Sequence, residues 1–175
     1  MTEPWTDERK TQEAWWTEAM ADPQRQEKFA EIKAAMLKGD LTLAQVGGFS
    51  PEEIDAAYAG ACKLVATGKL REALQIAGYF ILISPWEARH FYLAGVCLHR
   101  LNKPDQALQY YNVALAFADD GATLLGKGEV LLMLGRRDEA RKALQHGLRL
   151  LPSDEAHKPH FDRAVKLLST YCEPA

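Results

Sequence analysis

The sequence predicts an all-α fold in which three helical hairpins stack into a superhelical array, preceded by N-terminal helices and closed by a C-terminal capping helix. A turn that leads into a helix occurs three times, and each copy ends in an alanine. These alanines, Ala73, Ala107 and Ala140, are 34 and 33 residues apart. That interval is typical of tetratricopeptide repeats, whose units cannot bury their apolar faces alone and therefore stack on one another.

The three copies also agree in detail. The turns are Gly68-Lys69-Leu70-Arg71-Glu72-Ala73, Asn102-Lys103-Pro104-Asp105-Gln106-Ala107 and Gly135-Arg136-Arg137-Asp138-Glu139-Ala140. The middle unit matches the repeat signature best, with Phe91, Ala94-Gly95, Leu98 and Tyr111 at the expected positions, although no copy has the signature tryptophan. We therefore place the three repeats at residues 51–153.

Residues 1–23 form a polar extension that contains Trp5, Trp15 and Trp16. These tryptophans either pack back on the chain's own bundle or contact a second copy or another partner, as amphipathic aromatic residues do at interfaces. Both interpretations stay open.

Residues 24–50 form an N-terminal helical segment. Phe29, Ile32, Met36 and Leu37 recur at helical spacing, and Gly39 ends this helix. A second short element is expected at 41–46. Ser50-Pro51-Glu52-Glu53 is a helix start, with serine as the cap and acidic residues near the positive end of the helix dipole.

Residues 154–175 are expected to form the capping helix and tail, since a repeat array needs a terminal element with one polar side. The predicted buried face consists of Phe161, Ala164, Val165, Leu168 and Tyr171.

Composition excludes several classes of function. The formal net charge of −3 provides no basic footprint for nucleic acid and no polybasic patch for a membrane surface. The apolar runs are too short for stable membrane insertion. The acidic start resembles no signal peptide, and the three cysteines have no zinc-like spacing, so we expect a cytoplasmic protein.

The first helix of each hairpin has a second apolar face, and in a tetratricopeptide array the first helices line the concave surface. This face predicts a peptide-binding groove. Its residues are Tyr58, Cys62, Val65, Tyr92, Val96, His99, Leu125, Glu129 and Leu132.

The groove chemistry favours an apolar ligand. A clamp for a chain-terminal carboxylate needs lysine, arginine and asparagine on the first helices, whereas this face is mostly aromatic and aliphatic. An extended segment that inserts aliphatic and proline side chains fits better. The same face would alternatively be covered by the chain's own N-terminal helices or by a second copy.

We expect neither an enzyme nor a cofactor or metal. His157 and His160 are three residues apart but have no further ligand-like residues beside them. Cys62 and His99 lack a third orienting group for nucleophilic catalysis.

Taken together, Met36-Leu37-Lys38-Gly39, Ser50, Ile54, Tyr58-Ala59, the turn 68–73 and the stretch Arg89–Cys97 resemble the class II chaperones of type III secretion systems, of the SycD, LcrH and IpgC type. The resemblance covers residues 30 to 150. Tyr58 matches a groove tyrosine of that family, while Cys62, Val65 and Leu70 are smaller or non-aromatic where members often have Phe or Tyr.

The resemblance implies a bacterial cytoplasmic chaperone that holds hydrophobic translocator proteins before secretion by an extended segment in the groove. It also makes a homodimer plausible. The alternative from the residues alone is a generic tetratricopeptide adaptor or assembly factor.

Overall fold

The computed structural model describes residues 21–152, 154–155 and 157–172, so the tryptophan-bearing extension lies outside the described residues apart from its last three positions. The described secondary structure is entirely helical. In chain order the helices are α2 (Pro23–Lys38), α3 (Leu43–Val46), α4 (Pro51–Ala66), α5 (Leu70–Ile83), α6 (Ala88–Arg100), α7 (Pro104–Phe117), α8 (Gly121–Met133), α9 (Arg137–Leu150), α10 (Lys158–Leu167) and a π-helical segment (Leu168–Cys172).

The chain divides into two compact units between Gly47 and Gly48. The first contains α2 and α3. Helix α2 begins at a proline, with Asp22 accepting a hydrogen bond from the Gln24 amide, and it ends at Gly39 in the left-handed conformation. Helix α3 is a single turn whose Thr42 and Gln45 form a reciprocal capping box.

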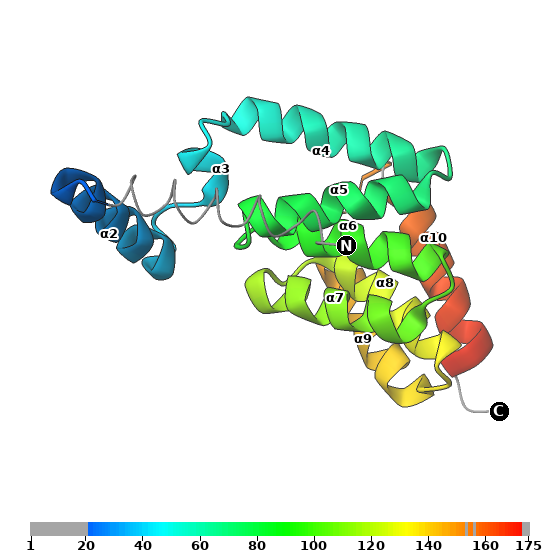
Figure 1. Cartoon of the computed structure of the whole chain (residues 1–175). Helices are drawn as coiled ribbons and strands as arrows, with labels where there is room; N and C mark the ends of the chain where they lie inside the picture. The colour runs from blue at the N-terminus through cyan, green and yellow to red at the C-terminus, as the bar shows by residue number, and fades with distance from the viewer. Residues whose placement is uncertain (1–20, 153, 156, 173–175) are drawn as a thin grey trace, which may run out of the picture. The chain divides into compact units, whose positions relative to one another are not determined.

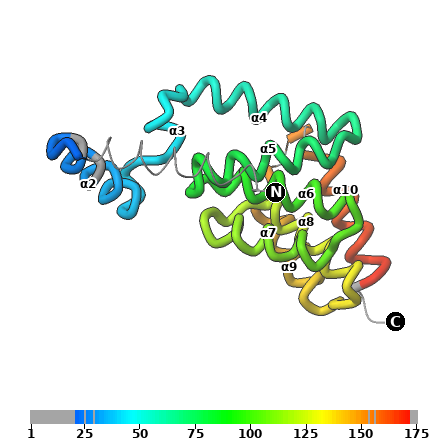
Figure 2. The backbone as a smooth tube through the Cα atoms, viewed as in Figure 1, coloured from blue at the N-terminus to red at the C-terminus, as the bar shows by residue number. Residues whose placement is uncertain are grey.

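The second unit contains the repeat array. Helices α4 and α5, α6 and α7, and α8 and α9 form successive antiparallel hairpins (Figure 1), and the path of the chain through them is followed most easily in the tube of Figure 2. The expected helix start at Ser50 is confirmed, because its hydroxyl accepts from the Glu53 amide while the Glu53 carboxylate accepts from the Ser50 amide. The predicted three-hairpin array is therefore confirmed.

The same turn closes the first helix of every hairpin. Gly68, Asn102 and Gly135 have φ angles of 81°, 58° and 74°, in the left-handed region that favours glycine and tolerates asparagine. In each turn the following amide donates to a carbonyl five residues earlier, as in Lys69 to Leu64 at 2.9 Å, the bond that defines a Schellman motif. This turn explains the recurring sequence pattern.

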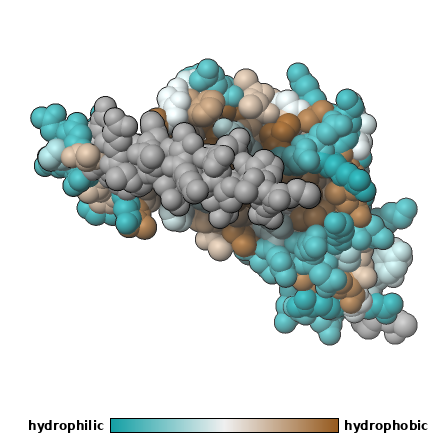
Figure 3. Space-filling model, viewed as in Figure 1, coloured by the Kyte–Doolittle hydropathy of each residue, from teal (hydrophilic) through white to brown (hydrophobic). Residues whose placement is uncertain are grey.

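Small residues allow the helices of the array to approach closely. Ala73, Ala107 and Ala140, whose spacing defined the repeat, are each 0% exposed. In the third hairpin a Cβ on Gly128 would lie 2.6 Å from Leu144, so this position admits no side chain without rearrangement. Over α7 and α9, the second helices, the visible surface is mostly hydrophilic with apolar patches between (Figure 3).

The C-terminal helix is shorter than expected, and its buried face differs from the predicted one. Ala164 is buried, but Phe161 and Val165 are 46% and 44% exposed. Leu168 packs on the core as predicted, and so does Leu167, which was not predicted. Ala164, Leu167 and Leu168 are three and four residues apart and share one face of the helix, whereas Val165 is turned about 100° away from Ala164. The chain becomes π-helical only at Leu168, after both exposed residues.

Candidate functional site

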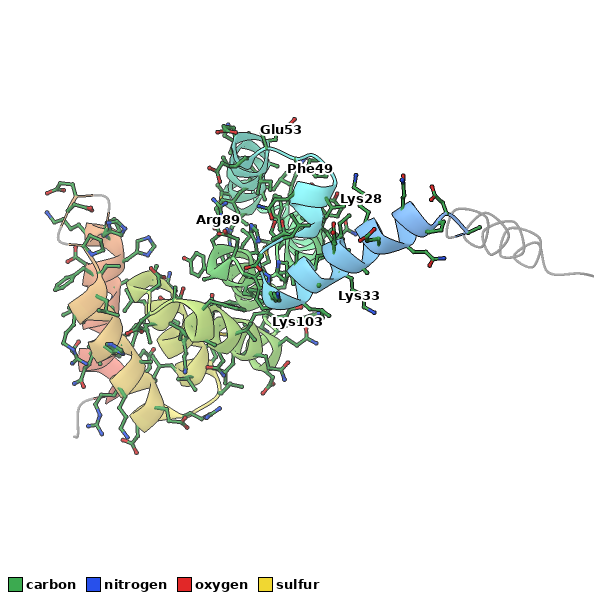
Figure 4. All side chains as sticks on the ribbon, turned by 90° about the vertical axis from the view of Figure 1, so that its left-hand side faces the viewer. Lys28, Lys33, Phe49, Glu53, Arg89 and Lys103 are labelled. Atoms are coloured by element: carbon green, nitrogen blue, oxygen red, sulfur yellow. The ribbon has the colours of Figure 1, made fainter. Side chains whose placement is uncertain are left out.

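The first helices α4 and α6 are tied side by side by polar contacts. Arg89 on α6 forms an ion pair with Asp55 on α4, and it reaches toward α4 in Figure 4. The Tyr58 hydroxyl donates to the Arg89 carbonyl at 3.4 Å, and the Arg100 guanidinium donates to the Val65 carbonyl. The residues of these pairs are 34, 31 and 35 positions apart, so each contact joins equivalent regions of consecutive repeats.

A hollow of about 410 Å³ lies along α6 and α8. It brings together five of the predicted groove residues, namely Tyr92, Val96, His99, Leu125 and Glu129. The other lining residues are Arg100, Asn102, Tyr111, Ala122, Gly126, Met133, His160 and Arg163. We call this hollow the groove.

Tyr111 on α7 contributes to the groove, although sequence reasoning placed it only in the repeat signature. Its ring lies between two glycines, because a Cβ on Gly95 would be 2.7 Å from the ring and a Cβ on Gly126 would be 2.9 Å from its hydroxyl end. The rings of Tyr92 and His99 lie beside it, at centroid distances of 6.2 and 6.4 Å. Burial raises the pKa of Tyr111, so the hydroxyl is neutral at physiological pH.

Tyr58 and Cys62 lie on α4 and are not among the residues that line the groove, although both are near Tyr92, which does line it. Burial raises the pKa of Tyr58, and the neighbouring Cys62 thiol and Tyr92 hydroxyl raise it further. Burial likewise raises the pKa of Tyr92. The Tyr58 ring also lies 6.3 Å from Phe80 and under the Arg89 guanidinium, 5.2 Å from its carbon, so this tyrosine has a packing role as well.

The remaining predicted residues lie elsewhere. Leu132 lines an adjoining hollow with Leu167 and Tyr171. Leu70 begins α5 and lines a separate depression at the hairpin turn with Leu101. The half-buried Val65 is placed near α6 by its backbone bond to Arg100.

The C-terminal end of the groove is polar. Arg163 on α10 holds Glu129 on α8 with two bonds, Nε to Oε1 at 2.7 Å and Nη2 to Oε2 at 2.8 Å. His99 Nε2 lies 3.9 Å from the same carboxylate. Burial raises the pKa of Glu129 against the opposing effect of Arg163, and burial lowers the pKa of His99. The end of the groove therefore has a paired carboxylate beside a neutral imidazole.

The contribution of α10 was missed by sequence reasoning, which treated this helix as a cap. A signal was present, because Glu129 and Arg163 are 34 residues apart, the same separation as Asp55 and Arg89. Helix α10 thus contacts α8 across one repeat length, as α6 contacts α4.

Among the described residues, no three histidine, cysteine, aspartate or glutamate side chains are grouped so that they could hold a metal ion. His157 instead bonds to Asp154 at 2.6 Å. None of the described helices combines the length and apolar character needed to cross a bilayer.

Comparison with known proteins identifies the fold through solved structures. No family model matches the sequence, and no curated relative matches it. A type III secretion complex from Aeromonas hydrophila aligns with a TM-score of 0.71 at 22% identity, covering 81% of this chain and 95% of that one. The Yersinia enterocolitica translocator chaperone SycD aligns with a TM-score of 0.66 at 20% identity, covering 73% and 96%.

PcrH from Pseudomonas aeruginosa also aligns with this chain, in the structure of its complex with the chaperone binding region of PopB. The TM-score is 0.60 at 27% identity, with 69% of this chain and 98% of that one covered. The protein therefore has the fold of the class II translocator chaperones of type III secretion systems across most of its length.

Proposed function

We propose that this protein is a bacterial cytoplasmic chaperone of a type III secretion system, which holds a hydrophobic translocator protein through an extended segment bound in the groove. The observation that carries the proposal is the groove itself. It lies on the first helices of an array whose fold matches chaperones solved with translocator segments, SycD with a peptide of YopD and PcrH with the chaperone binding region of PopD.

The groove suits an apolar segment in extended conformation. The half-buried Tyr92 and Val96 offer apolar surface, and the buried Leu125 and Tyr111 line the groove with them. Each apolar side chain that the ligand buries here is stabilised by roughly 1.5–3 kcal/mol. Several such anchors together offset the cost of ordering a flexible peptide.

Binding alone accounts for the proposed activity. Membrane-destined apolar segments aggregate when they are exposed in water, and a chaperone that binds the unfolded form lowers the concentration of free chains. The chemistry requires no nucleotide, metal or acid–base pair, and we propose no catalytic residue.

Co-expression with candidate translocator proteins from the same genome, chosen for their long apolar stretches, tests the proposal. The expected result is that the translocator becomes soluble and elutes with this protein. A double variant, Val96→Asp with Leu125→Asp, is expected to abolish this effect, while Lys142→Asp on the outer side of α9 leaves it unchanged. Helicity by circular dichroism must be compared for both variants, because Leu125 is buried.

A translocator that stays insoluble in the presence of the wild-type chain would contradict the proposal. Capture of a different extended peptide by the same groove would instead support the generic adaptor function.

A further inference from the structure

A second hollow adjoins the groove on the side of helix α10. It has a volume of about 350 Å³ and shares four lining residues with the groove, His99, Glu129, Met133 and Arg163. The two hollows therefore adjoin, and the Glu129–Arg163 pair forms part of both walls. We call the second one the C-terminal hollow.

The remaining walls of the C-terminal hollow are apolar. Leu132 comes from α8, Leu167 from α10 and Tyr171 from the π-helical segment. Tyr171 is 50% exposed, so part of its aromatic surface is open to a ligand. This chemistry matches that of the groove, whose walls are also aromatic and aliphatic.

The Glu129–Arg163 pair, which lines both hollows, leaves one arginine nitrogen for a ligand. Arg163 uses Nε and Nη2 for Glu129, and its side chain is 65% exposed whereas Glu129 is 18% exposed. Its third nitrogen, Nη1, therefore remains for a ligand oxygen. The lining residues of the two hollows include two arginines, Arg100 and Arg163, against the single carboxylate of Glu129.

Arg100 donates to a backbone carbonyl rather than to a carboxylate, so its charge is not neutralised by that contact. The lining of the two hollows is therefore positive by one charge. Charge complementarity favours an acidic residue in the bound segment, since an arginine binds a carboxylate more strongly than a neutral acceptor.

We propose that the C-terminal hollow is a second subsite for the same occupant. An extended polypeptide crosses the Glu129–Arg163 pair, buries an apolar side chain in the groove and another in the C-terminal hollow, and places an acidic side chain between them against Arg163. This inference rests on the proposed function, because the occupant is the translocator segment.

The test uses the full chain and short overlapping fluorescent peptides that cover the translocator identified by co-expression. The binding peptide is first identified by fluorescence anisotropy with the wild-type chain. Tyr171→Ser is expected to weaken its binding about fivefold, as loss of a half-buried aromatic contact would. Tyr79→Ser is the matched control, because Tyr79 is also 50% exposed but lies on α5, on none of the hollow walls described above.

A second arm tests the acidic residue. Replacing each Asp or Glu of the peptide by Asn or Gln is expected to weaken binding to the wild type at one position, and Arg163→Gln is expected to remove that difference. Removing the peptide's apolar residue beyond this acid is expected to abolish the effect of Tyr171→Ser while leaving the effect of Tyr92→Ala.

The outcomes separate the two proposals. If no peptide binds the wild-type chain, the proposed function fails. If a peptide binds and Tyr92→Ala weakens it, but Tyr171→Ser and Tyr79→Ser bind equally well, the second subsite is wrong while the groove stands. Thermal melting of each variant verifies that the chain is folded, and Leu132→Ser repeats the test from the opposite wall.

Discussion

At the scale of single residues, the position of Tyr111 depends on two neighbouring glycines. The ring fits between α6 and α8 because Gly95 and Gly126 have no side chains. A Cβ at Gly95 would lie 2.7 Å from two ring carbons, and the ring cannot swing away because Tyr111 is buried. The glycines thus determine the floor of the groove.

We predict that Gly95→Ala lowers the free energy of unfolding by about 1–3 kcal/mol, the usual cost of overpacking a core. Urea denaturation measures this change. The control is Gly78→Ala in α5, where a Cβ meets no atom within 4 Å. There the substitution should raise stability by about 0.4–1 kcal/mol, because alanine restricts the unfolded chain. Equal effects at both glycines would show that Tyr111 can repack.

We predict that His90 makes the free energy of unfolding depend on pH. It is buried, its Nδ1 lies 3.1 Å from the Ser84 carbonyl and is assigned as the donor, and Nε2 has no partner among the described residues. Burial lowers the pKa of His90 from its ordinary 6.5. The unfolded chain therefore binds the proton more readily, so the stability present above pH 6.5 is lost as the pH falls below it toward the folded pKa.

Melting temperatures between pH 7.5 and 5.5 test this prediction, with both values chosen to bracket the ordinary histidine pKa of about 6.5. His90→Asn retains a donor near the Nδ1 position but does not titrate, so its melting temperature should fall less over this range. The burial-lowered pKa of His99 acts in the same direction and leaves a residual dependence. If the melting temperature of His90→Asn falls with pH as much as that of the wild type, His90 is not the cause.

At the scale of elements, the hairpin turns hold the repeat register. Gly135 has a φ of 74°, and a left-handed conformation costs an L-residue about 1–2 kcal/mol. We predict that Gly135→Ala destabilises the chain by about 1 kcal/mol. Asn102→Gly, at the equivalent turn with a φ of 58°, should be neutral or stabilising. Denaturant midpoints compare the two, and a stabilising Gly135→Ala would contradict the prediction.

The turns also show what could be predicted from the sequence. The turn residues repeat at a fixed interval, because a left-handed backbone position limits which residues can occupy it. The hairpins and their order could therefore be predicted. Tyr111 and Arg163 were not recognised as groove residues. Helical periodicity states which residues share a face of one helix, but it does not state which other helix supplies the floor or the far wall.

The predicted face of α10 was partly wrong for a related reason. Ala164 and Leu168 pack on the core as predicted, and so does Leu167, but Phe161 and Val165 stay exposed. Helical spacing allows more than one apolar face in this segment, and the neighbouring helices decide which of them is covered.

At the scale of the whole molecule, the repeat array has its own core. The buried residues of the clusters around Tyr111 and around Leu144 come from α6 onward, and Leu74 of α5 packs against the first cluster. Helix α4 contributes the buried Ala61 and joins α6 through Tyr58, Asp55 and Val65. The division of the chain at Gly47–Gly48 falls before the capping box that starts α4. The array should therefore fold without the residues that precede it.

We predict that a fragment beginning at Gly48 unfolds cooperatively, with a melting temperature within a few degrees of that of the full chain, because stacked repeats depend mainly on their neighbours. Circular dichroism measures this. The fragment should also bind the translocator peptide with the affinity of the full chain. Tighter binding by the fragment would show that the preceding residues occupy the groove in the free protein. A segment that competes for the groove lowers the apparent affinity, because only the chains with an open groove can bind the peptide. If the fragment is unfolded, the residues before Gly48 are needed for folding. The groove would then belong to a folding unit larger than the three hairpins.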